Sequence, residues 1–351
     1  MKGKRLAHSL EKVIDRTRIR VKSRLGWTKP IIAFPYRGYG TPHAVKMRGR
    51  VLEKEARIHS GDGVPSANMW QNFKKMLDRF ESDEIPRATV SAELLGRQTQ
   101  AVSDEEGYFE LNFTFTEPLR VEPGWYPVAL TLESVPYGLK REPEAAGEVY
   151  IAPPEVPEFG VISDVDDTIL QSNITSTFGK FWTALRYDAA QRTPFEGVEA
   201  LYRMLVGKLP RPLFFVSGSS YNLYDLLVDF TQHHRIPKAP FLLRDLGLTT
   251  LNWIKQDSRP YKLGYIRELF EMYPGLNFIL IGDSGERDPE IYRDICRDFP
   301  GRVKAIYIRH VAGHERRQEV EALREQLNVD LLLMDTTDEA IEHAREHGWI
   351  A

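Results

Sequence analysis

The second half of the chain repeats one pattern, in which a short apolar run is followed by a stretch with helical spacing. This alternation predicts a mostly parallel sheet with helices on both faces, because parallel strands need long crossover connections. The apolar runs predict strands at 159–163, 212–217, 240–244, 277–282, 303–308 and 330–334. The stretches between them predict helices at 196–207, 220–234, 260–272, 287–298 and 314–326.

Polar side chains follow several of these predicted strands. In open parallel sheets, ligands bind at the carboxyl ends of the strands, so we expect these side chains to converge. Crowded carboxylates repel one another unless a cation neutralises them, and hard oxygen ligands suit Mg²⁺. Backbone N–H groups of "SGSS", predicted to open a helix, can also hold a phosphate oxygen. The residues are Asp164, Asp166 and Thr168 in "VISDVDDTIL", Ser217, Gly218 and Ser219 in "LFFVSGSS", Lys262 in "SRPYKLGYIRELF", and Asp283 and Asp288 in "IGDSGERDPEIY".

These four stretches, in this order, resemble the motifs of the haloacid dehalogenase superfamily. More closely, they resemble the catalytic domain of the actin-patch type phosphatidate phosphatase family and its bacterial relatives. The resemblance implies a Rossmann-like haloacid dehalogenase domain. It also implies a Mg²⁺-dependent phosphomonoester phosphatase that acts through an aspartyl-phosphate, with phosphatidate or a related phospholipid as its substrate.

The same resemblance assigns a role to each residue. Asp164 would be the nucleophile, and Asp166 would protonate the leaving alkoxide and later activate water. Ser217 and Lys262 would hold and neutralise the transferring phosphoryl group. The remaining substrate-binding residues would be Thr168, Gly218 and Ser219. The metal ligands would be Asp164, Asp166 through its backbone carbonyl, Asp283, and Asp288 through water or by orienting Lys262.

Three neighbouring residues are expected to have structural roles: Asp167 as a helix cap, and Arg244 and His310 near the rim of the site. Two other functions remain open. Residues 171–195 form at most a small lid, so an open site would also admit a phosphoprotein or a nucleic-acid end. The chain could instead be a non-catalytic scaffold that binds phosphate or lipid, although such a scaffold has no need of both Asp164 and Asp166.

The first half of the chain has the sequence pattern of a β-sandwich, with several short predicted strands separated by turns. The stretch "GYFELNFTF", 107–115, alternates apolar and polar residues, which is typical of a half-buried strand. We therefore predict a domain over 29–155 that resembles transthyretin-like or Ig-like modules, with a helical insertion at 66–82. No catalytic constellation is visible there, so we expect a binding module of unknown protein partner. Further predicted strands lie at 45–53, 87–95, 125–133 and 147–153.

Residues 1–28 form a third unit, before the sandwich at 29–155 and the phosphatase domain at 156–351. Residues 1–27 carry nine Lys or Arg against Glu11 and Asp15, although the whole chain has a net charge of -3. An amphipathic helix there could lie on an anionic lipid surface, or it could be a solvated arm or a helix docked on the phosphatase domain. The remainder is acidic, which argues against a nucleic-acid partner.

The expected location is the cytoplasm, with a peripheral association at a membrane as an option. The single cysteine, Cys296, excludes an intramolecular disulfide, and this favours a reducing compartment. No apolar run reaches the roughly 20 residues of a transmembrane helix, and the N-terminus has no apolar core before a cleavage site.

Overall fold

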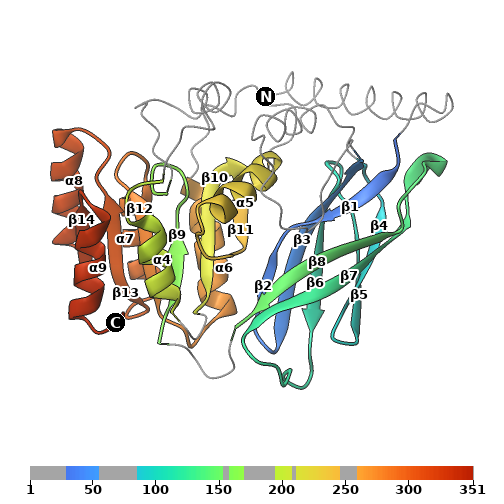
Figure 1. The fold of residues 1–351 in the computed structure, drawn as a ribbon, viewed down its shortest axis with the longest axis horizontal. Coiled ribbons are helices and arrows are strands. Elements are labelled where there is room, and N and C mark those ends of the chain that lie inside the picture. Colours follow the sequence, from blue (N-terminus) through green and yellow to red (C-terminus); the bar gives the residue numbers. More distant parts are fainter. Residues whose placement is uncertain are drawn as a thin grey trace.

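The computed structural model describes residues 29–54, 85–152, 158–169, 194–207, 211–245 and 259–350. These residues form an eight-stranded sheet from the first half of the chain and a six-stranded sheet from the second half, and the two pack side by side (Figure 1). The predicted segments 1–28 and 66–82, and most of 171–195, lie outside the described residues.

The six-stranded sheet is parallel, with the order β11-β10-β9-β12-β13-β14. The first of its strands lies in the middle, because the chain winds outward through β10 to β11 and then returns to β12 on the other side of β9. This arrangement places a topological switch point between β9 and β12, where open sheets of this kind bind ligands. All six predicted strands are confirmed, as Gly160–Ser163 (β9), Leu213–Ser220 (β10), Phe241–Arg244 (β11), Phe278–Asp283 (β12), Val303–Arg309 (β13) and Asp330–Met334 (β14).

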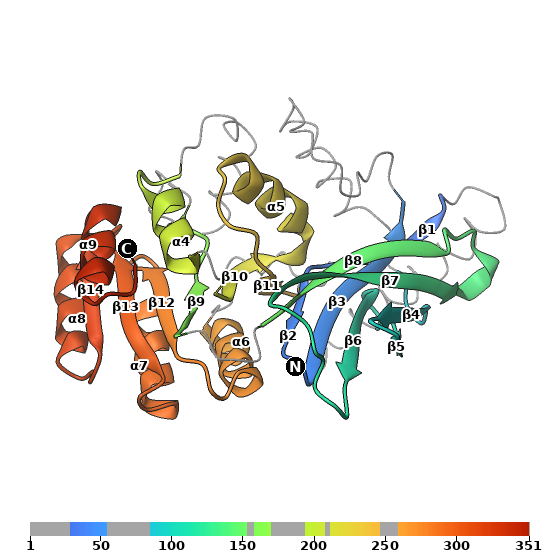
Figure 2. The same ribbon diagram turned by 60° about the horizontal axis from the view of Figure 1, so that its bottom comes forward.

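Helices cover both faces of this sheet (Figure 2). Consecutive strand residues such as Val161 and Ile162 belong to opposite apolar cores, so each strand is buried on both sides. One core takes the apolar faces of α4 (Val198–Val206), α5 (Tyr224–His233) and α9 (Thr337–Glu346). The other takes those of α6 (Arg259–Met272), α7 (Asp288–Asp298) and α8 (His314–Arg324).

The five predicted helices are present, with two differences. Helix α9 was not predicted. Strand β10 continues to Ser220 and a short 3-10 helix, η2, follows at Tyr221–Leu223 before α5. The prediction that Gly218 and Ser219 open a helix is therefore wrong: both residues lie in the extended end of β10. The side chain of Ser220 caps η2 by accepting a hydrogen bond from the Asn222 backbone N–H at 3.2 Å.

The first half forms one hydrogen-bonded sheet of order β1-β3-β2-β8-β7-β4-β5. Strands β1 and β2 pair with different parts of β3, and β6 pairs with β3 along its other side. Its inner face surrounds a single apolar core. The predicted strands correspond to β3, β4, β6, β7 and β8, whereas β1, β2 and β5 were not predicted. The elements are Ile31–Pro35 (β1), Gly38–Gly40 (β2), Ala44–Glu53 (β3), Thr89–Leu94 (β4), Arg97–Val102 (β5), Tyr108–Thr114 (β6), Gly124–Ser134 (β7), Pro136–Gly138 (η1) and Glu144–Ile151 (β8).

The two sheets meet beside β10 and β11. Tyr36 stacks on Tyr221 with ring centroids 4.4 Å apart, and the hydroxyl of Tyr224 accepts a hydrogen bond from the Arg37 backbone N–H at 2.8 Å. On the other side of the sheet, Tyr39 belongs to the same apolar core as helix α6. Both cores of the parallel sheet therefore continue into the first half of the chain.

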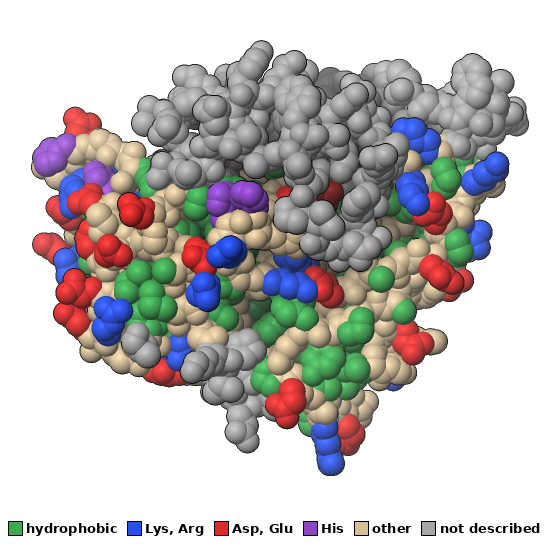
Figure 3. All heavy atoms as spheres, viewed as in Figure 1, with side chains coloured by type: hydrophobic (Ala, Val, Ile, Leu, Met, Phe, Trp, Pro, Cys, Tyr) green, Lys and Arg blue, Asp and Glu red, His purple; other side chains and the backbone are tan. Residues whose placement is uncertain are grey.

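Polar contacts surround this junction. Glu268 of α6 accepts hydrogen bonds from the Tyr39 hydroxyl at 2.6 Å and the Lys46 ammonium group at 2.9 Å, and Arg48 donates to the Tyr265 hydroxyl at 2.8 Å. Figure 3 shows Lys and Arg side chains interspersed with Asp and Glu over the described part of one face. Within the described ranges, no helix has both the length and the apolar character that a membrane crossing requires.

Candidate active site

Asp164 follows β9 directly, at the centre of the sheet. Its backbone N–H donates to the Ile281 carbonyl at 2.9 Å, which extends the ladder between β9 and β12 and fixes the start of the loop. The side chain is 1% exposed. One carboxylate oxygen, Oδ1, lies 2.6 Å from Lys262 Nζ, and the other accepts a long hydrogen bond of 3.4 Å from the Thr168 hydroxyl. Asp167 turns the chain with a φ of 53° in the left-handed region.

Lys262 projects from the first turn of α6 into the same site. Its ammonium nitrogen lies 2.8 Å from Asp288 Oδ1 and 2.8 Å from Glu286 Oε2, in addition to the contact with Asp164. Burial alone would lower the pKa of this lysine, but the surrounding carboxylates outweigh burial and raise the pKa well above its ordinary value. The ammonium group is therefore charged and serves as the central cation of the cluster.

Asp283 ends β12, and Asp288 begins α7. Asp283 Oδ1 accepts backbone hydrogen bonds from Gly285 at 2.6 Å and Glu286 at 2.9 Å, which hold the loop. The Asp283 backbone N–H in turn donates to Asp288 Oδ2 at 3.3 Å. Glycine is required at position 282, because a Cβ atom there would lie 2.5 Å from the Asp288 carboxylate. Asp164, Asp283 and Asp288 each offer an oxygen, and these oxygens lie within 4.8 Å of one another.

Among the described residues, the carboxylates of this cluster outnumber its cations. Asp164, Asp283, Asp288 and Glu286 face the one ammonium group of Lys262. Burial raises the pKa values of all three aspartates, and like charges nearby raise them further against the opposing effect of Lys262. Asp283 Oδ2 is buried and has no hydrogen-bond partner within the described part of the chain. A divalent cation bound here would pair this oxygen and offset most of the excess negative charge.

Asp166 occupies a separate, hydroxyl-lined position. The hydroxyls of Ser217 and Ser219 both donate to its Oδ2, at 2.7 and 2.8 Å. Its other oxygen, Oδ1, is buried and has no hydrogen-bond partner among the residues that the structure describes. Burial and the charge of Glu286 raise the pKa of Asp166, although the serine hydroxyls lower it in part. The carboxyl group is thus fixed through one oxygen, and the other is free to carry a proton.

Contacts join eight of the nine residues that the sequence singled out in two groups, one around Lys262 and one around Asp166, and Gly218 lies between the two serines in β10. The Ser217 hydroxyl contacts Asp166, and it also accepts the Ser219 backbone N–H at 2.9 Å. That N–H is therefore already paired. Arg244 stacks over the Tyr261 ring at 4.5 Å, and His310 Nδ1 lies 3.5 Å from the Ser284 hydroxyl, so both side chains contact residues next to the site.

Sequence reasoning missed three residues that shape the site. Glu286 contacts Lys262, and its place in the acidic string "GDSGERD" was a visible signal. Arg316 of α8 donates to the backbone carbonyls of Ser284 and Glu286, both at 3.0 Å, and so clamps the loop after β12. Arg309 donates to the Thr168 carbonyl at 3.3 Å. No local signal marks either arginine, because each contact spans more than 20 residues.

Comparisons with known proteins point to one family. Residues 159–310 match the family described as phosphatidate phosphatase APP1, catalytic domain. The chain is 25% identical over 281 residues to phosphatidate phosphatase APP1 of Saccharomyces cerevisiae, which covers 76% of this chain and 47% of the yeast protein. It is 29% identical over 155 residues to an uncharacterized protein of Schizosaccharomyces pombe, which covers 43% of this chain and 25% of that protein. The chain therefore spans less than half the length of either relative.

Among solved structures, a carbohydrate acetylesterase from Xanthomonas citri matches at 10% identity with a TM-score of 0.27, over 84% of this chain and 65% of that one. This similarity is too low to support a conclusion. The family match, in contrast, includes every site residue from Asp164 to Asp288. Residues 159–310 thus resemble the catalytic domain of the phosphatidate phosphatase APP1 family, which confirms the resemblance predicted from the four motifs.

Proposed function

We propose that the chain is a Mg²⁺-dependent phosphomonoester phosphatase of the haloacid dehalogenase superfamily, and that it acts on phosphatidate or a related phospholipid. The observation that carries this proposal is the placement of two buried carboxyl groups at the switch point of the sheet. Asp164 lies against the Lys262 ammonium group, and Asp166 lies against two serine hydroxyls. The family match supports the reaction class and the lipid substrate.

In the first step, a carboxylate oxygen of Asp164 attacks the phosphorus atom and forms an aspartyl-phosphate. The bond from phosphorus to the leaving oxygen breaks, and Asp166 donates a proton to that oxygen. In the second step, Asp166 takes a proton from the attacking water. The water oxygen bonds to phosphorus, inorganic phosphate leaves, and the Asp164 carboxylate is restored.

The surroundings of the two carboxyl groups fit these different roles. Asp166 must carry a proton in the first step, and its raised pKa favours the protonated form. Ser217 and Ser219 orient it through Oδ2, so Oδ1 is the atom from which the proton is transferred. Lys262 lies 2.6 Å from Asp164, where its charge would stabilise the phosphoryl oxygens as they gather charge in the transition state.

The residues present fit a Mg²⁺ ion. The candidate ligands are carboxylate oxygens, which Mg²⁺ prefers, and the cluster has excess negative charge and the unpaired Asp283 Oδ2. We propose Asp164, Asp283 and the backbone carbonyl of Asp166 as ligands, with Asp288 orienting Lys262. When bound, the ion would neutralise charge on the transferring phosphoryl group.

The wider organisation is part of the same proposal. We propose that 156–351 form the phosphatase domain and that 29–155 form a transthyretin-like or Ig-like sandwich domain. Residues 1–28 would provide a basic segment for a peripheral contact with a membrane in the cytoplasm. The two sheets and the polar contacts between them are compatible with a scaffold that supports the catalytic half.

The test is phosphate release by the full chain with and without Mg²⁺. Phosphatidate in mixed micelles is compared with soluble phosphomonoesters, a phosphopeptide and a 5′-phosphorylated oligonucleotide. We expect Mg²⁺-dependent release from phosphatidate, and we expect Asp164→Asn to reduce it at least about 10³-fold, because the nucleophile is lost. Asp335→Asn is the matched control, since this surface carboxylate pairs with Arg317 and lies outside the site.

Each outcome separates the alternatives. Release from soluble esters alone would keep the chemistry and refute the lipid substrate. A preference for the phosphopeptide or the oligonucleotide would favour the macromolecular substrates that an open site would also admit. If no substrate is turned over while the protein still binds inorganic phosphate, the non-catalytic scaffold would replace the enzyme as the leading function.

A further inference from the structure

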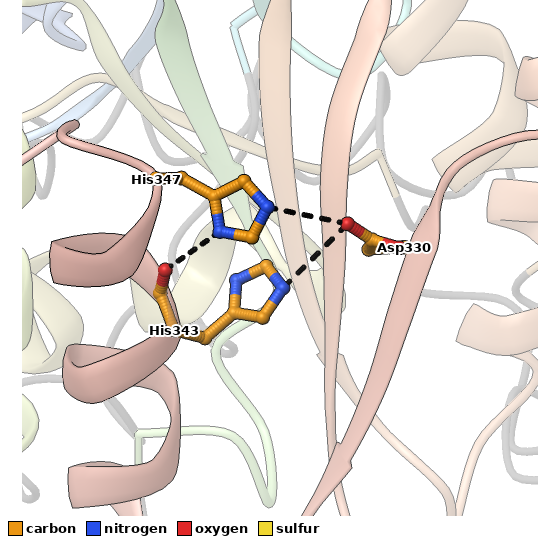
Figure 4. A group of neighbouring side chains, drawn as sticks. All are labelled: Asp330, His343 and His347. Atoms are coloured by element: carbon orange, nitrogen blue, oxygen red, sulfur yellow. Dashed lines mark hydrogen bonds and ion pairs between the residues drawn. The ribbon is translucent and has the colours of Figure 1, made fainter.

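A second group of potential ligand atoms converges at the opposite edge of the parallel sheet. Asp330 is the first residue of β14, so it lies at the amino end of that strand, whereas the candidate active site lies at carboxyl ends. His343 lies in the last turns of α9, and His347, four residues later, is the C-cap residue of the helix. Figure 4 shows both imidazole rings directed toward Asp330. Their Nε2 atoms lie 3.7 and 3.5 Å, respectively, from the same carboxylate oxygen, Oδ2.

The second nitrogen of each ring has its own partner. His347 Nδ1 lies 2.9 Å from the backbone carbonyl of His343, which can only accept a hydrogen bond. Nδ1 must therefore carry the proton, and in the neutral ring Nε2 keeps its lone pair. His343 Nδ1 lies 3.1 Å from the Tyr307 hydroxyl, which can accept in the same way. Metal-binding histidines usually have such a partner on the nitrogen that does not bind the metal.

The distances favour a shared ion over direct hydrogen bonds. At 3.5 and 3.7 Å, the gaps between the imidazoles and Asp330 exceed the range of about 2.7–3.2 Å for a good N–H···O bond. A tetrahedral zinc ion with bonds of about 2.0–2.1 Å would hold its ligand atoms about 3.4 Å apart. The His343 and His347 rings stack with centroids 4.2 Å apart, and both Nε2 atoms point toward the same Asp330 oxygen (Figure 4). All three ligand atoms lie within 4.8 Å of one another.

The ligand atoms of this cluster favour a different metal ion from the one that the candidate active site favours. Two imidazole nitrogens and one carboxylate suit borderline ions such as Zn²⁺, whereas the all-carboxylate site suits Mg²⁺. The Asp330 and His347 side chains are 59% and 39% exposed, which leaves a path for an ion to enter. Trp349 packs beside both rings, at 5.8 and 4.8 Å, and limits their movement.

We propose that Asp330, His343 and His347 bind Zn²⁺, with water in the fourth position. The ion would join the first residue of β14 to the last turns of α9 and its C-terminal end, and so stabilise the last strand–helix pair of the chain. The chemistry of the proposed phosphatase does not depend on this site, because the two clusters share no residue.

The experiment is a calorimetric titration of the chelator-treated full chain with ZnCl2 in excess Mg²⁺, together with the thermal unfolding midpoint. Excess Mg²⁺ competes for the carboxylates at the other edge. We expect the unaltered protein to bind one Zn²⁺ and to unfold at a higher temperature. His347→Gln and Asp330→Asn should each weaken binding at least about tenfold. The control His314→Gln, at an exposed histidine of α8, and the active-site variant Asp283→Asn should bind as the unaltered protein does.

Three results would overturn the proposal. The first is no zinc binding by the unaltered protein. The second is unchanged affinity in both cluster variants. The third is loss of the zinc site in Asp283→Asn or His314→Gln while the cluster variants retain it. Circular dichroism of the zinc-free variants checks their folding, and if His347→Gln fails to fold, Asp330→Asn decides the test because its side chain projects into solvent.

Discussion

Acidic and nitrogen-containing side chains cluster at both ends of the parallel strands, but they are buried at the carboxyl edge of the sheet and exposed at the amino edge. At the carboxyl edge, Asp164, Asp283 and Lys262 are at most 2% exposed, and their charges interact in a medium of low dielectric. At the amino edge, water screens Asp330 and His347. The comparison indicates that burial, more than residue type, determines how much the free energy of unfolding falls when one partner of a charged pair is removed.

The largest effect is expected at the buried edge, from Lys262→Met. Removing this cation leaves Asp164 and Asp288 buried without their partner, which should lower the free energy of unfolding by about 3–5 kcal/mol in a chelating buffer. Mg²⁺ should restore part of the loss. The measurement is urea unfolding. Lys304→Met is the control, because Lys304 pairs with the half-exposed Glu158 at 3.1 Å and should change the free energy by less than about 1 kcal/mol. Equal losses in both variants would refute the role given to burial.

An intermediate effect is expected from Glu290→Gln, beside the same edge. Burial raises the pKa of Glu290. Hydrogen bonds from Arg316 at 2.7 and 2.8 Å, a backbone hydrogen bond and the charges of Arg316 and Arg287 together outweigh burial, so the net pKa is below its ordinary value. The ionised pair therefore stabilises the fold above the ordinary glutamate pKa of about 4.3, and this contribution is lost as the pH falls through the lower folded-state value.

Glu290→Gln should accordingly cost about 1–3 kcal/mol at pH 7, and the difference should close below about pH 4. Unfolding curves over this pH range measure it. Glu319→Gln is a matched control, because Glu319 binds the same arginine with a side chain that is 65% exposed. A cost for Glu290→Gln that does not vary with pH would show that the ionised pair is not its source.

The smallest effect is expected at the exposed edge. In a chelating buffer, Asp330→Asn should change the free energy of unfolding by less than about 0.5 kcal/mol, since screened surface pairs contribute little. With Zn²⁺ present, the unaltered protein should become the more stable of the two. Thermal unfolding with and without the ion measures both values, and Asp335→Asn serves as the surface control. A large cost without zinc would remove the contrast between the two edges.

Much of the parallel-sheet half could be predicted from sequence, because its strands are continuous apolar runs with polar residues directly after them. Asp164 and Asp283 converge simply because parallel strands end at one edge. Contacts that depend on tertiary packing could not be predicted, such as the Arg316 clamp on the loop after β12. The spacing of His343 and His347 was visible, but their pairing with Asp330 depends on how α9 returns along β14.

In the first half, β2 and β5 escaped prediction for local reasons, and β1 was missed although it reads "IIAFP". Strand β2 has only three residues, and β5 reads "RQTQAV", in which most side chains are exposed and no apolar alternation is visible. Their pairing partners, rather than their own residues, make them strands. Gly218 and Ser219 do not begin a helix, contrary to the prediction, because β10 continues through them. There the Ser219 backbone N–H donates to the Ser217 hydroxyl.

The stack of Tyr36 on Tyr221 also has a consequence for recombination between genes, because the two rings come from different halves of the chain. Tyr221 lies two residues after Ser219, whose hydroxyl holds Asp166, so a ring from the first half of the chain supports the segment that positions an acid of the second half. A recombination event that moved residues 156–351 into another gene would transfer the acids and the lysine but leave Tyr36 behind. The transferred segment would then carry Tyr221 without the ring that stacks on it.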